Sequence, residues 1–269
     1  MSPASTGRRR PSGREADTAE QTPEQHDLWY VYGITFEDVK VPEALEGLDD
    51  RPVDLIRSGG LAAIVSEFTD GKRIGKKVQL LAHSRVLDSI AAKGTVLPLR
   101  FGTVVADRST LASQVLEPGE ERFTQMLNGL KGRSQYTLQA RYDEQKVLAE
   151  IVREDPQIAE LREQTRGAPE DTTLNARLRL GELVSVALQN KRESDVPAVL
   201  KPVLKHAVAH SVRDSGYGVE HLVDVALLID DDHWDEFDRA AEGVARALAG
   251  RVRLKLLGPT APYDFVAEL

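Results

Sequence analysis

A strand–helix–strand unit near the carboxyl end most constrains the fold of this chain. Residues 219–229 are rich in Val and Leu, which predicts a buried strand, and residues 231–249 follow with a helical pattern that ends at Gly250. Residues 251–257 then alternate between basic and apolar side chains, as a half-buried strand does. Two parallel strands joined in this way require a right-handed connection, so this part of the chain combines a sheet with a helix.

The rest of the chain shows the same mixture of strand and helix patterns. Clusters of β-branched and aromatic residues predict strands at residues 28–34, 61–66, 96–105 and 135–142. Apolar residues at helical spacing predict helices over residues 76–92, 109–130, 143–166 and 172–192 and from Pro197 to about 213, with a break expected at Pro118-Gly119. The sequence therefore predicts an α+β fold with two α+β lobes and a helical middle section.

Composition divides the chain into three parts. Residues 1–26 contain hardly any large apolar side chain and are expected to form a disordered polar tail. Residues 27–143 are expected to form an N-terminal α+β domain. Residues 144–269 begin with charged helices and are expected to form a C-terminal helical and α+β domain.

The charge balance and the amino-acid usage exclude several classes of function. The chain has 35 basic and 43 acidic residues, a net charge of −8, which argues against broad nucleic-acid binding. It has no cysteine, which excludes disulfides, thiolate metal sites and cysteine nucleophiles. No apolar run approaches the roughly 18–20 residues of a membrane helix, so we expect a soluble cytoplasmic protein that does not enter a membrane.

Two patterns suggest a metal site, and each departs from the motif concerned. His206 and His210 lie four apart on a predicted helix, but the acid and the third ligand of a zinc site are missing, so ordinary surface residues are favoured. The acidic run at residues 230–238 lacks the glycine and the alternating ligands of a calcium loop. Capping of the following helix by Asp231 or Asp232 is the favoured interpretation.

The remaining patterns do not assemble a catalytic site. Gly71–Lys77 is similar to a phosphate-binding loop, but a lysine occupies the position of the required hydroxyl, so a basic loop is favoured, with contact to an acidic protein as the next interpretation. There is no Gly-x-Ser-x-Gly sequence for a serine nucleophile. The aromatic cluster at residues 29–32 is expected to lie in the core. The residues themselves therefore give no catalytic residue, no metal ligand and no cofactor.

The segment Leu97–Val105 breaks the pattern of a plain core strand. Pro98 removes one donor from the sheet ladder, which places it at a strand start, an edge or a bulge. Gly102 leaves room for a close approach to the backbone. Arg100 brings a permanent charge into an apolar run and needs a partner.

Residues 96–103, which include this segment, closely resemble the central motif of the gas vesicle protein F/L family (GvpF/GvpL). Further segments are similar to that family in the family's own order, at residues 28–34, 136–143, 225–230 and 258–266. The last of these resembles a Gly-Pro-Trp-Pro-Pro-Tyr-x-Phe motif, but it has Thr260 and Ala261 where the motif has Trp and Pro. The polar extension of 27 residues lies outside the family's core.

The resemblance implies a non-enzymatic accessory or minor structural role in building gas vesicles, which are cytoplasmic gas-filled protein shells. The implied partners are the hydrophobic gas vesicle shell protein and other gas vesicle accessory proteins, and the implied C-terminal lobe is ferredoxin-like. The residues expected to serve interaction or structure are Pro98, Arg100, Phe101, Gly102, Gly258, Pro259, Pro262, Tyr263 and Phe265.

Several questions stay open at the level of sequence. A binder of the shell protein could use a sheet edge or an apolar groove between the lobes. Arg100 could form an internal ion pair that fixes the lobes, which is the favoured interpretation, or it could reach a partner. The segment Tyr263–Val266 is expected to fold back on the body of the protein. The alternative function is a small-ligand-binding or enzymatic α+β protein with an unrecognised cleft, since fold alone does not decide function.

Overall fold

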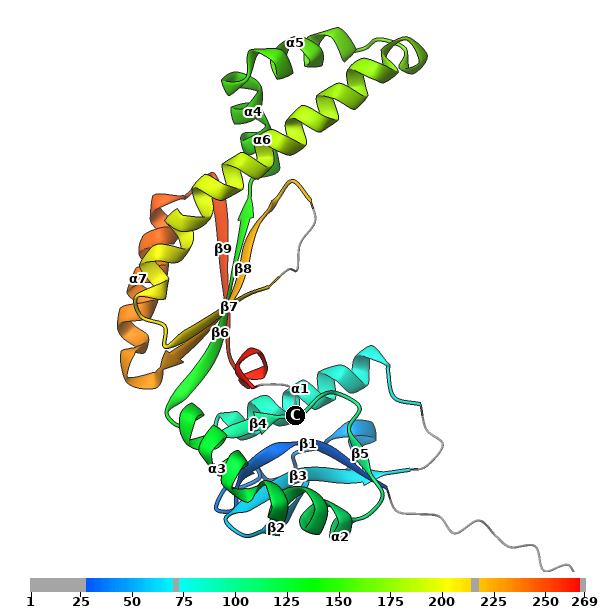
Figure 1. Cartoon of the computed structure of the whole chain (residues 1–269), viewed down its shortest axis with the longest axis vertical. Helices are drawn as coiled ribbons and strands as arrows, with labels where there is room; N and C mark the ends of the chain where they lie inside the picture. The colour runs from blue at the N-terminus through cyan, green and yellow to red at the C-terminus, as the bar shows by residue number, and fades with distance from the viewer. Residues whose placement is uncertain (1–27, 70–72, 214–217, 267–269) are drawn as a thin grey trace, which may run out of the picture.

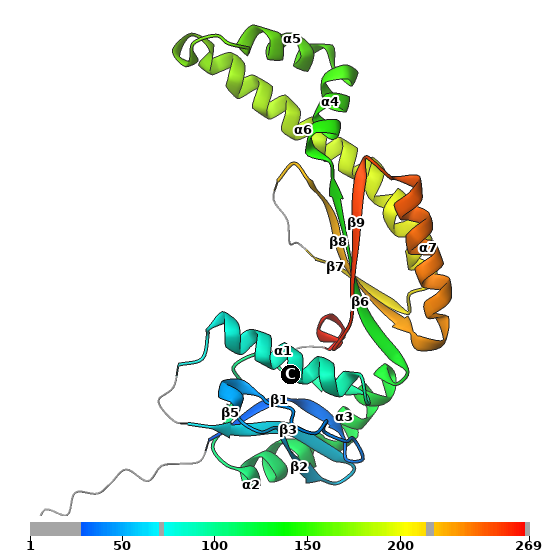
Figure 2. The same cartoon turned by 180° about the vertical axis from the view of Figure 1, so that it is seen from behind.

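The computed structural model describes residues 28–69, 73–213 and 218–266. The chain forms two lobes, each built on its own antiparallel sheet, and a helical arm extends from the second lobe (Figure 1, Figure 2). This confirms the predicted α+β class. The predicted polar tail at residues 1–26 lies outside the described residues.

The first lobe is a five-stranded sheet between two helical layers. Its strand order is β2 (Asp54–Ser58), β3 (Leu61–Phe68), β1 (Leu28–Phe36) and β4 (Val96–Pro98), and β5 (Val104–Val105) also pairs with β1. The helix α1 (Lys77–Ala91) packs on one face of the sheet. The other face is covered by a continuous helical segment formed by α2 (Arg108–Thr110), η2 (Leu111–Leu116) and α3 (Glu117–Leu130).

The central strand β1 determines how the first lobe packs. Its side chains alternate between the two faces, so Tyr30 and Tyr32 lie in the apolar cluster of α1 while Trp29 and Val31 lie in that of α3. Gly33 interrupts the register with β3, and a Cβ atom there would lie 2.5 Å from the carbonyl oxygen of Leu97. Glycine is therefore required where β4 comes close to β1.

The second lobe is built on a four-stranded sheet. The strand order is β7 (Ala209–Arg213), β8 (His221–Asp230), β6 (Arg133–Tyr142) and β9 (Val252–Thr260). The helices are α4 (Glu144–Glu154), α5 (Pro156–Thr165), α6 (Glu170–Leu204) and α7 (Trp234–Ala247), with short turns η3 (Asp231–His233) and η4 (Tyr263–Phe265). The helix α7 and the second half of α6 cover one face of the sheet, while α4, α5 and the first half of α6 extend beyond its end (Figure 1, Figure 2). Counting α4–α6 as one layer, the β-α-β-β-α-β element order is that of a split βαβ unit, in which β6 lies between the parallel β8 and β9.

The structure places the change of lobe earlier than the predicted boundary after residue 143. Strand β6 pairs with β8 and β9, so the chain passes from the first sheet to the second at residues 131–132. The pairing partners of β6 lie more than 75 residues further along the chain, from residue 221 onward, so local pattern alone could not assign this strand to its sheet.

The predicted break at Pro118-Gly119 is wrong, because the helix continues through it. The backbone N–H of Glu117 bonds to the carbonyl of Ala112, five residues earlier, which makes η2 a π-helical segment. A wider turn of this kind accommodates Pro118, which has no N–H to donate.

The predicted helix from Pro197 to about 213 is also corrected. One helix of 35 residues, α6, runs through Pro197 and ends at Leu204, and residues 209–213 form the edge strand β7. The backbone of β7 pairs with β8, and this tertiary pairing outweighs the helical pattern of the local sequence.

Candidate functional site

The segment Leu97–Val105 forms two short edge strands with a tight turn between them, not the single strand that was predicted. Pro98 lies at the end of β4 opposite Gly33, and β4 occupies the edge of the sheet as the proline indicated. In the turn, the carbonyl of Arg100 accepts hydrogen bonds from the backbone N–H and the hydroxyl of Thr103, at 3.3 and 2.8 Å. Gly102 has a φ of +97°, which favours glycine and turns the chain back into β5.

A buried hydrogen-bonded chain connects this turn to β1 and α1. The backbone N–H of Gly102 donates to the Tyr30 hydroxyl at 3.0 Å, and the same hydroxyl lies 2.9 Å from Nδ1 of His83. His83 is 1% exposed, and its Nε2 has no hydrogen-bond partner within the described part of the chain. Burial raises the pKa of Tyr30 and lowers the pKa of His83 to about 4, so both groups are neutral near pH 7.

The motif at residues 258–266 returns from the second lobe to the turn between β4 and β5 and to His83. Gly258 has a φ of +135° and lies so close to β6 that a Cβ atom would be 2.8 Å from the carbonyl oxygen of Gln135. The peptide bond from Gly258 to Pro259 is cis. Beyond it, the ring of Tyr263 lies 6.2 Å from the ring of His83, and the ring of Phe101 lies 5.6 Å from it on another side. The two motifs, about 160 residues apart in sequence, thus meet at one histidine.

Two carboxylates that the sequence analysis missed hold this return segment. Asp88 on α1 accepts a hydrogen bond of 2.8 Å from the backbone N–H of Ala261, which is fully buried. A proline at position 261, as in the family motif, would have no N–H to donate. Because this chain has Ala261 there instead, the hydrogen bond to Asp88 can form. Asp264 accepts hydrogen bonds from Gln135 on β6 at 2.7 Å and from Arg213 on β7 at 2.9 Å.

The predicted site residues lie at several places around the meeting of the two motifs. Phe101 and Tyr263 contact His83, Gly102 is linked to it through the Tyr30 hydroxyl, and Gly258 and Pro259 lie along β6. Phe265 and Val266 pack against an apolar cluster that contains Leu228 of β8 and residues of the first lobe, which confirms that the end of the chain folds back. Pro262 lines a groove of about 340 Å³ between the lobes, and Arg100 is exposed at the turn. We call this assembly the lobe junction.

The signal for His83 was present in the sequence. His83 lies on the same helical face as Val86, Leu87 and Ile90, all of which are buried, so its burial follows from the spacing of α1. Asp88 carries no comparable signal, because its partner comes from another lobe.

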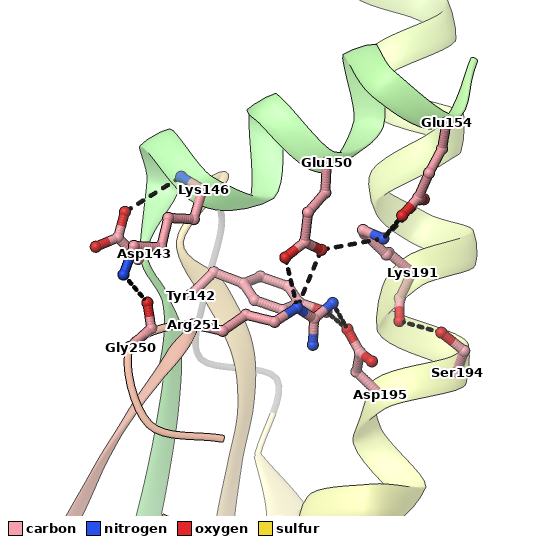
Figure 3. A network of polar contacts seen from close by, with 10 residues as sticks. All are labelled: Tyr142, Asp143, Lys146, Glu150, Glu154, Lys191, Ser194, Asp195, Gly250 and Arg251. Carbon is pink, nitrogen blue, oxygen red and sulfur yellow. Dashed lines mark hydrogen bonds and ion pairs between the residues drawn. The ribbon is translucent and has the colours of Figure 1, made fainter. Parts of the chain in front are cut away.

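A second polar assembly holds the helical arm on the second sheet (Figure 3). Nε of Arg251, at the start of β9, lies 2.9 and 3.0 Å from the two carboxylate oxygens of Glu150 on α4, and its Nη2 lies 2.6 Å from Asp195 on α6. Lys191 on α6 pairs with Glu150 at 3.2 Å, and the Tyr142 hydroxyl donates to Asp195 at 2.7 Å. We call these five side chains the arm clasp.

The arm clasp balances its charges in a partly buried place. Burial opposes ionisation of Asp195, but hydrogen bonds from Arg251 and Tyr142 outweigh it and lower the pKa of the carboxyl group. The hydrogen bond to Asp195 raises the pKa of Arg251 in return. The clasp joins α4, α6 and β9 at one point.

The other sequence patterns do not form sites. His206 follows the end of α6 and His210 lies in β7, so they do not share a helical face. The N-cap of α7 is His233, whose side chain makes no capping hydrogen bond, which corrects the expected capping by aspartate. Asp231 instead accepts a hydrogen bond of 2.7 Å from the hydroxyl of Ser134. In the basic loop, residues 71 and 72 lie outside the described residues, and Lys77 begins α1.

The described residues offer neither a metal cluster nor a membrane-spanning helix. No three His, Cys, Asp or Glu side chains there are grouped so that they could hold a metal ion. None of the helices in the described ranges is both long enough and apolar enough to span a membrane.

The geometry defines a class of protein with two α+β lobes, a junction between segments that are far apart in the sequence, and a projecting helical arm. Comparison with known proteins identifies the family within this class. The family model of the gas vesicle synthesis protein GvpL/GvpF matches residues 28–267, and the chain belongs to that family. Gas vesicle protein F of Streptomyces sp. (strain CB03234) is 34% identical over 240 residues, which cover 88% of this chain and 98% of that protein.

Solved structures show the same fold. The crystal structure of GvpF from Anabaena sp. PCC7120 superposes with a TM-score of 0.74 at 24% identity and covers 90% of this chain and 98% of that one. The crystal structure of GvpF from Microcystis aeruginosa gives a TM-score of 0.70 at 21% identity, with coverage of 89% and 99%. Gas vesicle protein L2 of Halobacterium salinarum is 25% identical over 256 residues, covering 89% of this chain and 91% of that protein, so relatives of both types match.

The buried His83 predicts a loss of stability in acid. Its pKa is about 4 in the folded protein and about 6.5 when unfolded, so the unfolded chain binds more protons between these values. The contribution of His83 is therefore complete above about pH 6.5 and is lost as the pH falls to about 4, by about 3 kcal/mol. Urea denaturation at a series of pH values measures this, and we expect His83→Gln to flatten the dependence. The exposed His233→Gln is the control, and equal slopes for wild type and His83→Gln would contradict the assignment.

The arm clasp predicts a large difference between two arginines. Arg251→Met leaves Glu150 and Asp195 close together without their shared partner, and we expect it to lower the free energy of unfolding by about 2 kcal/mol. Arg246→Met, which removes an exposed pair with Glu242 at 3.7 Å, should cost less than about 0.5 kcal/mol. Urea denaturation of both variants tests this, and equal losses would show that the clasp adds nothing beyond a surface pair.

Proposed function

We propose that this protein is a non-enzymatic accessory or minor structural protein of gas vesicle assembly. It acts in the cytoplasm and at the gas vesicle, where it binds the hydrophobic shell protein and other gas vesicle accessory proteins. Membership of the GvpL/GvpF family supports a role in gas vesicle formation. The surface of α1 supports the finer proposal of shell-protein binding.

An exposed apolar patch on α1 carries this proposal. Val78, Leu80 and Leu81 lie within the first two turns of the helix and are 67%, 47% and 59% exposed. Three large apolar side chains so close together are unusual on a protein in which 29% of residues are charged. We call these three residues the α1 patch.

The surroundings of the α1 patch suit an apolar polypeptide segment. A groove of about 430 Å³ runs beside Val78 and Leu81, between α1 and the turn η1 (Leu48–Asp50). The exposed Lys76, Lys77 and Arg85 surround the apolar side chains. A hydrophobic shell subunit would bury its surface here before incorporation, while the charged rim keeps the complex in solution.

The turn between β4 and β5 offers a second contact near the lobe junction. β4 is an edge strand, and the turn that follows it carries the exposed Arg100. We propose that this turn contributes to partner binding, and that the motif residues around it hold the turn in shape.

Small-ligand binding is the second candidate function, and one cleft favours it. A cleft of about 700 Å³ in the first lobe is lined by Lys40, Lys93 and Lys131, which come from three different segments, and also by Glu37 and Asp38. The three lysines would suit an anionic group of a ligand. Binding of an anion there, without any capture of the shell protein, would favour this candidate over the assembly role.

Leu81→Asp tests the proposed function directly. Because Leu81 is exposed, the substitution should leave the melting temperature unchanged, but it should lower capture of co-expressed shell protein at least about tenfold, as loss of a buried leucine implies. Val186→Asp is the matched control, since Val186 is 58% exposed on α6, far from the patch. Equal capture by wild type and both variants would contradict the α1 patch as the binding surface.

Arg100→Ala separates partner binding from internal stabilisation. Contact of this turn with the partner predicts that capture of the shell protein falls several-fold while the melting temperature stays within about 2 °C of the wild type. Arg253→Ala, an exposed arginine on β9, is the control. A lower melting temperature with unchanged capture would instead assign Arg100 to the stability of the lobes.

A further inference from the structure

The helical arm presents a row of side chains that nothing in the first lobe or the second sheet covers. The arm comprises α4, α5 and the first half of α6, and it extends beyond the end of the second sheet (Figure 1, Figure 2). Leu174 and Leu178 are 58% and 59% exposed, and Gly181 and Ser185 are also exposed. The spacings of four, three and four residues place these side chains on one face of α6, and we call them the outer row.

Gly181 has no explanation within the described chain. Glycine is among the least favourable residues in a helix interior, and Gly181 lies near the middle of the first half of a 35-residue helix. A Cβ atom at this position would meet no atom within 4 Å. At Gly33, by contrast, the same atom would collide with the backbone of β4. No contact within the described chain requires glycine at position 181. The absence of a side chain there permits another helix to approach closely.

The order of large and small residues in the outer row is self-complementary. We propose that the outer row binds the same row of a second copy of this chain, in antiparallel orientation, about a two-fold axis between Arg179 and Leu180. In this register each Leu178 faces Gly181 of the second copy, and each Leu174 faces Ser185. A large residue opposite a small one lets two helices interdigitate, and a two-fold contact of this kind closes into a dimer.

The charges next to the row agree with the same register. Arg179 and Glu182 lie on one flank of α6 and form an exposed ion pair of 3.2 Å within the helix. The two-fold axis brings Glu182 of one copy within about 3 Å, along the helix axis, of the level of Arg179 of the other. The dimer thus brings the two arginines close to the two glutamates, and their opposite charges attract. A parallel pairing in register would instead place like charges at the same level.

The arm clasp prepares the arm for this contact. It fixes α4 and α6 to β9 near the base of the arm, so the outer row is held at a defined angle before a second copy arrives. Such preorganisation lowers the cost of association. The outer row is short, so we expect a weak dimer in the micromolar range.

Sedimentation equilibrium between about 1 µM and 1 mM tests the proposal, since this is the range of small interfaces. We expect reversible dimers of the wild type and at least about tenfold weaker association of Leu178→Glu. Val186→Glu, on another face of α6, should dimerise as the wild type does. Gly181→Leu should match or exceed the wild-type melting temperature, because leucine favours helix, and yet associate at least about tenfold more weakly.

The orientation is tested by disulfide formation, because the chain has no cysteine of its own. Leu178→Cys chains mixed with Gly181→Cys chains should form a mixed disulfide dimer under mild oxidation, and neither variant alone should do so to a comparable extent. A monomer at all concentrations, a dimer unaffected by Leu178→Glu and Gly181→Leu, or efficient cross-linking of Leu178→Cys chains with each other would each overturn the proposal.

Discussion

The return of the carboxyl-terminal segment to α1 is the interaction on which the arrangement of the two lobes depends. The backbone passes from one sheet to the other only at residues 131–132 within the described chain, and a single connection would leave the lobes free to move. The N–H of Ala261 on Asp88, the ring of Tyr263 beside His83 and the packing of Phe265 remove that freedom. The lobes are therefore joined by contacts at their interface as well as by the connecting chain.

This junction explains why the two motifs of the sequence have the residues they have. Gly102 provides a backbone N–H at a turn whose positive φ favours glycine, and Gly258 lets β9 pass close to β6 where a side chain would collide. Tyr30 and His83 are buried in their neutral forms and connect the first turn to the helix on which the second motif lands. The resemblance to the GvpL/GvpF family thus lies in the parts that build the junction.

The two surfaces that we propose to bind partners lie away from this junction. The α1 patch occupies the free end of α1, and the outer row lies on the arm, beyond the second sheet. The arm clasp holds α6 through paired charges, and the lobe junction holds α1 through the hydrogen bond from Ala261 to Asp88. The exposed apolar side chains thus lie at two defined places outside the closed cores.

The sequence by itself determined the α+β class, most of the strands and helices, the edge position of Pro98 and the burial of the apolar faces, because these follow from periodicities within a few residues. It did not determine that β6 belongs to the second sheet, that residues 209–213 form a strand, or that the helix passes through Pro118, because pairing with distant strands and a π-helical turn decided these. The same holds for the site. The motif residues were visible in the sequence, but only the tertiary structure brought Phe101, His83 and Tyr263 together and placed Ala261 on Asp88, since these contacts join segments up to 173 residues apart.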